Sequence, residues 1–379
     1  MIYFDNNATT QIAPEVFEAM KPYLTEFYGN PSSSHTFGRN VRNAVNLARE
    51  QVASLLNAKN TDEIYFTSGG TESDNWAILG TLEANPHKKH IVTTEVEHEA
   101  VRKLCDKLEK QGYEISRIGV DEKGLLNSDE LKSVLRKDTA IVSVMLANNE
   151  TGVICPIKEV SEIIKASSDA VFHVDGVNAV GKMICDMQNF GVDLFSISGH
   201  KFHAPKGIGA LFARNGVNLP SMLIGGGQEN AKRAGTEAVH QIAAIGAAAN
   251  FVKDFSKIET VRKLRDKFEE FVLQSIVNTQ LNGDKTQRLP NTASLSFVGL
   301  EGETILAMLN DIGVCVSTGS ACNAENHVSS AVLRAMEVPY EVAKGTLRFS
   351  FGRFNTENEV DFLIEKLPII IGNLREISL

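Results

Sequence analysis

The segment SGHK brings an amine, an imidazole and a hydroxyl together, directly after the apolar run DLFSIS (193–198). Such a run predicts a buried strand, so Lys201 follows a strand end. Most lysines are solvated surface charges, but desolvation lowers the pKa of an amine and makes it a nucleophile that can form a Schiff base. Ser198 and His200 could donate hydrogen bonds to a phosphate. Lys206 is the competing lysine, in a turn that we expect to be more exposed.

Asp175, Gly70 and Thr71 lie at two further strand ends. Asp175 closes the apolar run AVFHVD, and open α/β sheets bind their ligands at such ends. Its carboxylate could pair with a protonated pyridine nitrogen or could cap the next helix, and both interpretations stay open. Gly70 and Thr71 follow a strand in FTSGGTES, where the N–H groups of a helix start could bind phosphate or form a plain cap.

Three more polar residues follow or lie on expected strands. His98 in EVEHEAV could stack on a cofactor ring or could be an ordinary capping or surface histidine. Asn149 in LANNETG belongs either to a turn or to an edge that faces substrate. Arg348 in TLRFSFG is a candidate bidentate clamp for a carboxylate, and a structural salt bridge is the alternative.

The chain has five cysteines, and none forms a CxxC or another metal-ligand spacing. We therefore expect no intrinsic metal site, and idle or buried thiols at most positions. Cys322 differs because it lies in VCVSTGSACNAENHVSS, whose small and polar residues predict an accessible loop at about 317–330. An accessible thiol is reactive to the extent that it forms thiolate.

The composition narrows the classes of function. The 379 residues carry a net charge of −9, so no basic surplus is present to neutralise nucleic acid or an anionic membrane. The start of the chain, MIYFDNNATT, has no secretory pattern, and no stretch is long and apolar enough for a membrane helix. These features predict a cytoplasmic protein.

The order of the predicted elements indicates how these residues are positioned. Strand-like runs alternate with helical patterns through the first two-thirds of the chain, which predicts an α/β fold with a mostly parallel sheet. From about 256, a long amphipathic helix and the strands TASLSFV and TLRFSFG indicate a smaller α+β domain. We expect a large domain at 17–255 and a small one formed by 1–16 and 256–379.

Taken together, the motifs resemble the NifS/IscS family of cysteine desulfurases, within the class V aminotransferase-like enzymes that use pyridoxal 5′-phosphate. The resemblance runs through nearly the whole chain in the family's order, as YFDNNATT, GNPSSSHTFG, TSGGTES, EHEAV, ANNETG, HVDGV, SGHK, GGGQE, RAGTE, GSAC and RFSFGR. It implies the aspartate aminotransferase-like fold, with a seven-stranded sheet in the large domain.

The resemblance implies a role for each matching residue. The catalytic residues would be Lys201, which carries the cofactor, His98, which stacks on the pyridine ring, and Cys322, which attacks the substrate sulfur. Asp175 would pair with the pyridine nitrogen, and Arg348 would bind the substrate carboxylate. Asn149 and Asn178 would lie near the phenolic oxygen and the substrate. The phosphate would be bound by Gly70, Thr71, Ser198, His200 and, from the second subunit of a homodimer, Thr236.

The activity implied is removal of sulfur from L-cysteine, which gives L-alanine and a persulfide on Cys322. The sulfur would pass to an iron–sulfur scaffold or another acceptor protein, with Cys322 as a transient ligand of the cluster. A selenocysteine lyase and a sulfur donor for tRNA thiolation stay open as alternatives. An aminotransferase would not need the loop cysteine, and an inactive scaffold would not need Lys201 or Asp175.

The chain departs from the family pattern at three places. Asn178 stands where the family usually has glutamine, and its side chain is one methylene shorter, so its contact with the cofactor is either lost or bridged by water. GGTES replaces the commoner GATES, which we expect to be harmless because backbone groups bind the phosphate. HVSSAV (327–332) replaces a Pro-Ser-His-like turn after the cysteine, so loop mobility and partner docking do not carry over.

Overall fold

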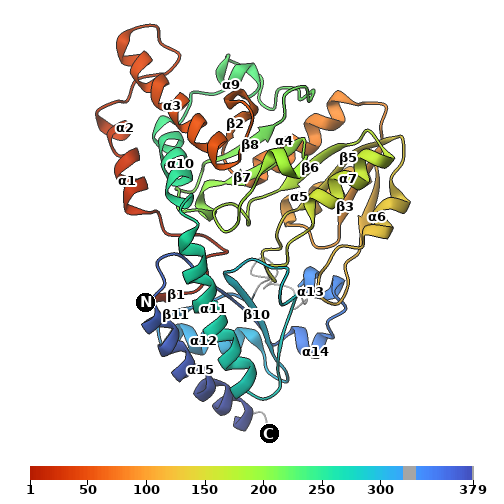
Figure 1. Ribbon diagram of the computed structural model, residues 1–379, viewed down its shortest axis with the longest axis vertical. Coiled ribbons are helices and arrows are strands. Elements are labelled where there is room, and N and C mark those ends of the chain that lie inside the picture. Colours follow the sequence, from red (N-terminus) through yellow and green to blue (C-terminus); the bar gives the residue numbers. More distant parts are fainter. Residues whose placement is uncertain (319–329, 378–379) are drawn as a thin grey trace.

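The large sheet has seven strands in the order β2-β8-β7-β6-β5-β3-β4 in the computed structural model, which describes residues 1–318 and 330–377 (Figure 1). Only β8 runs antiparallel to its neighbours, so the predicted mostly parallel α/β sheet is confirmed. The strands are β2 (Ile64–Thr67), β3 (His90–Thr94), β4 (Glu114–Ile118), β5 (Thr139–Met145), β6 (Val171–Asp175), β7 (Leu194–Ser198) and β8 (Gly209–Ala213).

Helices cover both faces of this sheet, which explains why its central strands are continuous apolar runs rather than alternating ones. All the residues of β5, for example, are buried. One face packs against α4 (Gly70–Ala84) and α5 (Glu99–Lys110). The other face packs mainly against α3 (Thr36–Leu55), α7 (Ile157–Ser167) and α10 (Val239–Val252).

A second, smaller sheet lies in the C-terminal part of the chain. Its strands β9 (Thr279–Leu281), β10 (Thr292–Phe297) and β12 (Thr346–Ser350) are antiparallel in the order β12-β10-β9. This sheet packs against α11 (Ser256–Ser275), α12 (Gly302–Asp311) and α15 (Glu357–Ile377). None of the described helices is long and apolar enough to span a membrane.

The remaining helices and turns are shorter. They are α1 (Pro14–Met20), α2 (Pro22–Thr25), α6 (Ser128–Val134), α8 (Met187–Phe190), α9 (Gln228–Ala231), α13 (Ala331–Ala335) and α14 (Tyr340–Ala343), with 3₁₀ turns at Thr61–Glu63 and Gly199–Lys201. The N-terminal strand β1 (Ile2–Tyr3) pairs in parallel with β11 (Val314–Cys315), and Figure 1 shows it among the blue C-terminal elements.

The hydrophobic cores support a division into two domains. Phe4 packs in the C-terminal core, whereas Ala13 and Val16 pack in the core of the large sheet. We therefore propose that the chain crosses between the domains before Ala13, slightly earlier than the boundary of 17 that the sequence suggested. The short N-terminal segment between Phe4 and Ala13 then runs across the junction, where the site described next is found.

Candidate active site

A cavity of about 370 Å³ lies at the carboxyl ends of the strands of the large sheet. It is bounded by the starts of α4 and α5, the N-terminal segment and β12. Ten of the predicted site residues line it: Gly70, Thr71, His98, Asn149, Asp175, Asn178, Ser198, His200, Lys201 and Arg348.

Two predicted site residues are not placed in this cavity. Cys322 lies outside the described residues. Thr236 is described and exposed, in the segment before α10, and it is not among the residues that line the cavity. Its assignment to the phosphate of a neighbouring subunit stays a prediction.

Asp175 and His98 form one wall. Asp175 ends β6, is 5% exposed, and accepts a hydrogen bond from the Val177 N–H at 2.9 Å. Burial raises the pKa of this carboxyl group, while its electrostatic interactions with His98 and Lys201 act to lower it. His98 caps α5 through Nδ1, which accepts from the Ala100 N–H at 3.2 Å. His98 therefore both caps the helix and lines the cavity, two positions that the sequence left as alternatives.

Lys201 enters the cavity from the 3₁₀ turn after β7. Its Nζ donates hydrogen bonds to the backbone oxygens of Asn7 at 2.6 Å and Ala8 at 3.1 Å. These carbonyls hold the half-buried amine at the cavity. His200 next to it is kept neutral, because burial and the charge of Lys201 lower its pKa to about 4.

The helix start at α4 also lines the cavity and suits an anion. Gly69 precedes the helix with a φ of 152°, a conformation that favours glycine. The N-terminal N–H groups of this helix attract negative charge, as a phosphate site requires. Glu72, in the first turn, is engaged by the Arg233 guanidinium at 2.9 Å, so its charge is offset.

Gly70 is packed more tightly than the sequence suggested. A Cβ at this position would lie 2.6 Å from Cγ2 of Val177, a branched side chain with little freedom to move. The alanine that is common in GATES would therefore clash in this chain. The glycine at position 70 therefore fits the valine at position 177, and we do not expect the exchange of glycine for alanine to be neutral in this chain.

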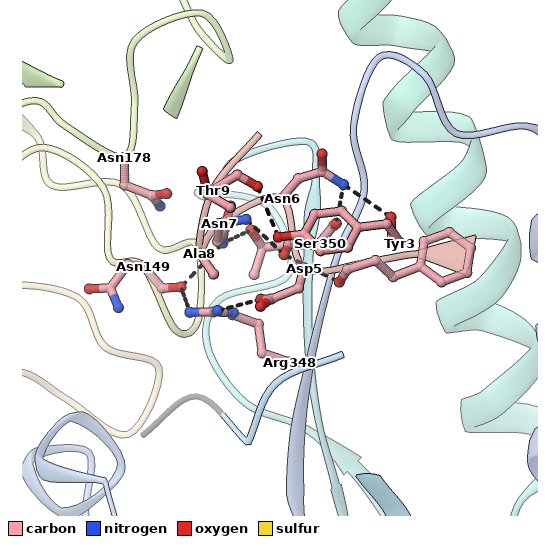
Figure 2. Close-up of polar contacts among 12 residues, drawn as sticks. Tyr3, Asp5, Asn6, Asn7, Ala8, Thr9, Asn149, Asn178, Arg348 and Ser350 are labelled. Carbon is pink, nitrogen blue, oxygen red and sulfur yellow. Dashed lines mark hydrogen bonds and ion pairs between the residues drawn. The ribbon is translucent and has the colours of Figure 1, made fainter. Parts of the chain in front are cut away.

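Arg348 lies between the N-terminal segment and Asn149 (Figure 2). Its Nη2 pairs with Asp5 at 2.7 Å, and its Nη1 donates to the backbone oxygen of Asn149 at 2.9 Å. The salt bridge that the sequence left as an alternative is thus present. The buried Nε has no hydrogen-bond partner among the described residues, and the Arg348 side chain lines the cavity.

The sequence reasoning missed several residues at the site. Asn7 connects Lys201, Asn149 and Lys182, although it is far from them in the sequence. Glu97 also lines the cavity, and burial raises its pKa to about 8. The local sequence around Asn7, YFDNNATT, gives one signal of its own, a pair of adjacent amides in the segment expected to belong to the small domain.

The aminotransferase class-V family model matches residues 2–363. The chain belongs to this family. A relative named cysteine desulfurase, from Trichormus azollae, is 50% identical and covers 100% of this chain and 94% of its own length. The cysteine desulfurase NifS of Azotobacter vinelandii is 46% identical and covers 100% of this chain and 94% of that protein.

The solved structures agree with this class-V assignment. A NifS-like protein superimposes with a TM-score of 0.93 at 35% identity, over 98% of this chain and 100% of that one. The predicted fold of the pyridoxal-phosphate-dependent transferases is thereby confirmed. Class-V desulfurases use pyridoxal 5′-phosphate, and the cavity fits it, with an amine at Lys201, a buried acid at Asp175 and a glycine-lined helix start at Gly70.

Proposed function

We propose that this chain is a cysteine desulfurase that converts L-cysteine into L-alanine and leaves the sulfur as a persulfide on Cys322. The single observation that carries the proposal is the cavity, which combines the Lys201 amine, the Asp175 carboxyl group and the free Nε of Arg348. The names of relatives that match the whole chain support it.

The cavity residues have separate roles in holding the cofactor. Pyridoxal phosphate, when bound, supplies an electron sink for negative charge on the substrate. Lys201 would bind it covalently, and the helix start at Gly70 and Thr71 would hold its phosphate with Ser198 and His200. Asp175 would pair with the ring nitrogen, a role that suits a buried carboxyl group flanked by positive charge.

The substrate would be bound by cavity residues that do not hold the cofactor. The Nε of Arg348 would hold the carboxylate of L-cysteine, and Asn149 would lie beside it. The Lys201 amine would move the proton at the substrate α-carbon. The carbonyls of Asn7 and Ala8 hold this amine at the cavity.

Cys322 would attack the substrate sulfur as a thiolate. A sulfur–sulfur bond forms, the carbon–sulfur bond breaks, and its electron pair stays on the substrate carbon, which takes up a proton to become the methyl group of alanine. The residues on either side of the segment that carries Cys322 support this role, because Ser317 and Ala331 both line the cavity.

The other cysteines are less suited to this step. Cys105 and Cys185 are buried, and burial raises the pKa of the Cys105 thiol to about 12 and that of Cys185 further. Burial also raises the pKa of Cys155, while Cys315 is half-buried beside Tyr3 in the β1–β11 pair.

We also propose a homodimer, with Thr236 reaching the partner's phosphate site, and a cytoplasmic location. The sulfur on Cys322 would be delivered to iron–sulfur cluster assembly through an acceptor protein. The exposed position of Thr236 suits a contact between subunits.

A direct test is to incubate the purified protein with L-cysteine and measure alanine and sulfide with and without a thiol reductant. We expect catalytic alanine formation only with reductant, which releases the persulfide as sulfide, and one alanine per site without it. Borohydride reduction followed by peptide mapping should place the cofactor on Lys201. No alanine, or a label on Lys206, would contradict the proposal.

A further inference from the structure

Lys182 is a second amine close to the site, and none of the roles above uses it. It lies in the turns that follow β6, and its Nζ donates to Oδ1 of Asn178 at 2.7 Å and to Oδ1 of Asn7 at 2.8 Å. No carboxylate pairs with it among the described residues, although a shielded amine usually has such a partner.

The amine is adapted to donate to these two oxygens. Burial lowers its pKa well below the ordinary value, and the charges of Lys201 and Arg348 lower it further. The Nζ of lysine carries at least two N–H groups, and the two amide oxygens accept hydrogen bonds from it. Lys182 is therefore held by two amides rather than by a carboxylate of the described residues.

These contacts fix how the Asn178 amide is turned. Its oxygen faces Lys182, and its Nδ2 donates to the backbone oxygen of Asn148 at 3.2 Å, an atom that can only accept. Asn178 is 4% exposed and lines the cavity beside Lys201. Among the described residues Nδ2 makes this one hydrogen bond, so its second N–H is available to a ligand.

We propose that Lys182 is a positioning residue of the active site, which holds the Asn178 oxygen away from the cavity so that an N–H is presented to the phenolic oxygen of the cofactor. This inference rests on the proposed function, in which Asn178 lies near that oxygen. Through Asn7, Lys182 also supports the backbone carbonyl that receives the Lys201 amine. The short amide at 178 makes this support more important, because the side chain has less reach.

The test is the pH titration of the visible absorbance of the bound cofactor in Lys182→Met. A hydrogen bond donated to the phenolic oxygen stabilises the deprotonated form of the bound cofactor. It therefore lowers the pH at which the bound cofactor loses its proton. Without Lys182 the buried Asn178 oxygen lacks a donor, so we expect the amide to rotate and the hydrogen bond to the phenolic oxygen to be lost. The midpoint of the absorbance titration should then rise by about one pH unit, as expected for one lost hydrogen bond. Lys182→Ala should give the same rise and avoids placing an apolar chain between two amides if the methionine variant does not fold.

A double-mutant cycle separates positioning from a general effect of charge. Asn178→Ala should raise the midpoint by a similar amount, and Lys182→Met added to it should cause no further rise. Lys88→Met is the matched control, because Lys88 is also mostly buried but pairs with Asp169. Its titration should match the wild type.

Two results would overturn the role of Lys182: a wild-type midpoint in both Lys182 variants, or an equal rise in the presence and absence of the Asn178 amide. A wild-type protein with no pH-dependent visible band would instead overturn the proposed function, and this inference with it.

Discussion

Arg348 illustrates how one side chain serves both the fold and the site. Two of its nitrogens join Asp5 and the Asn149 carbonyl, and only Nε is left without a partner among the described residues. The guanidinium is held rigidly by these contacts, so the remaining donor is oriented in advance for a carboxylate. Under the proposed function, binding of the substrate carboxylate would therefore depend on this particular nitrogen rather than on the charge alone.

Arg348→Lys should keep a positive charge near Asp5 but remove the Nε donor. We expect the KM for L-cysteine to rise about 10- to 100-fold, the range for a lost hydrogen bond between charged groups, with a smaller change in kcat. Steady-state alanine formation measures both. Arg214→Lys is the control, since Arg214 donates to the carbonyls of Val192 and Met187. An unchanged KM in Arg348→Lys would contradict this role.

The residues that the sequence could identify are those whose local setting is distinctive. Lys201 and Asp175 each follow a buried strand, and strand ends meet at one edge of a parallel sheet. Asn7 and Lys182 carry no such signal, because their importance comes from contacts between segments more than a hundred residues apart in the sequence. A single sequence does not reveal contacts of that kind.

At the scale of elements, the start of α4 depends on its packing against the loop after β6. Gly70→Ala should weaken binding of pyridoxal phosphate about tenfold, because the added methyl group meets Val177 and moves the helix start. Shortening the neighbour in Gly70→Ala/Val177→Ala should restore much of the affinity. Fluorescence titration of the apoprotein with cofactor measures both variants.

Equal affinities in wild type and Gly70→Ala would contradict this packing argument and would support the simpler expectation that alanine is harmless here. Val177→Ala alone is the control for the loss of the valine side chain from the cavity wall.

The element pattern was predictable because it follows from local periodicity. The apolar runs at β6 and β7 and the amphipathic α11 were all expected near their observed positions. The short strands β1 and β11 were not, since two residues give no periodic signal and their pairing is long-range. For the same reason the packing of Ala13 and Val16 with the large sheet was missed.

At the scale of the whole molecule, the account requires two subunits that share their sites. Thr236→Asp should place a negative charge against the partner's phosphate site and inactivate the enzyme, and Lys201→Ala should inactivate it by removing the amine. In a mixed dimer one site has an intact Lys201 and an intact Thr236. Mixing the variants after subunit exchange should restore about a quarter of wild-type activity, because half of randomly paired dimers are mixed and each has one intact site.

Sedimentation of the same samples should show dimers throughout. An active monomer, or no recovery in mixed dimers that are shown to form, would contradict a shared site.

The central claim is that sulfur leaves L-cysteine by transfer to Cys322. The most direct measurement is alanine formation by Cys322→Ser, with the visible spectrum of the cofactor recorded on addition of L-cysteine. Lys201, Asp175 and Arg348 are unchanged, so the substrate should still shift the spectrum, while alanine formation should fall by orders of magnitude because a serine hydroxyl is a poor acceptor of sulfur. Cys315→Ser should retain most of the activity. Near-normal alanine formation by Cys322→Ser would contradict the account.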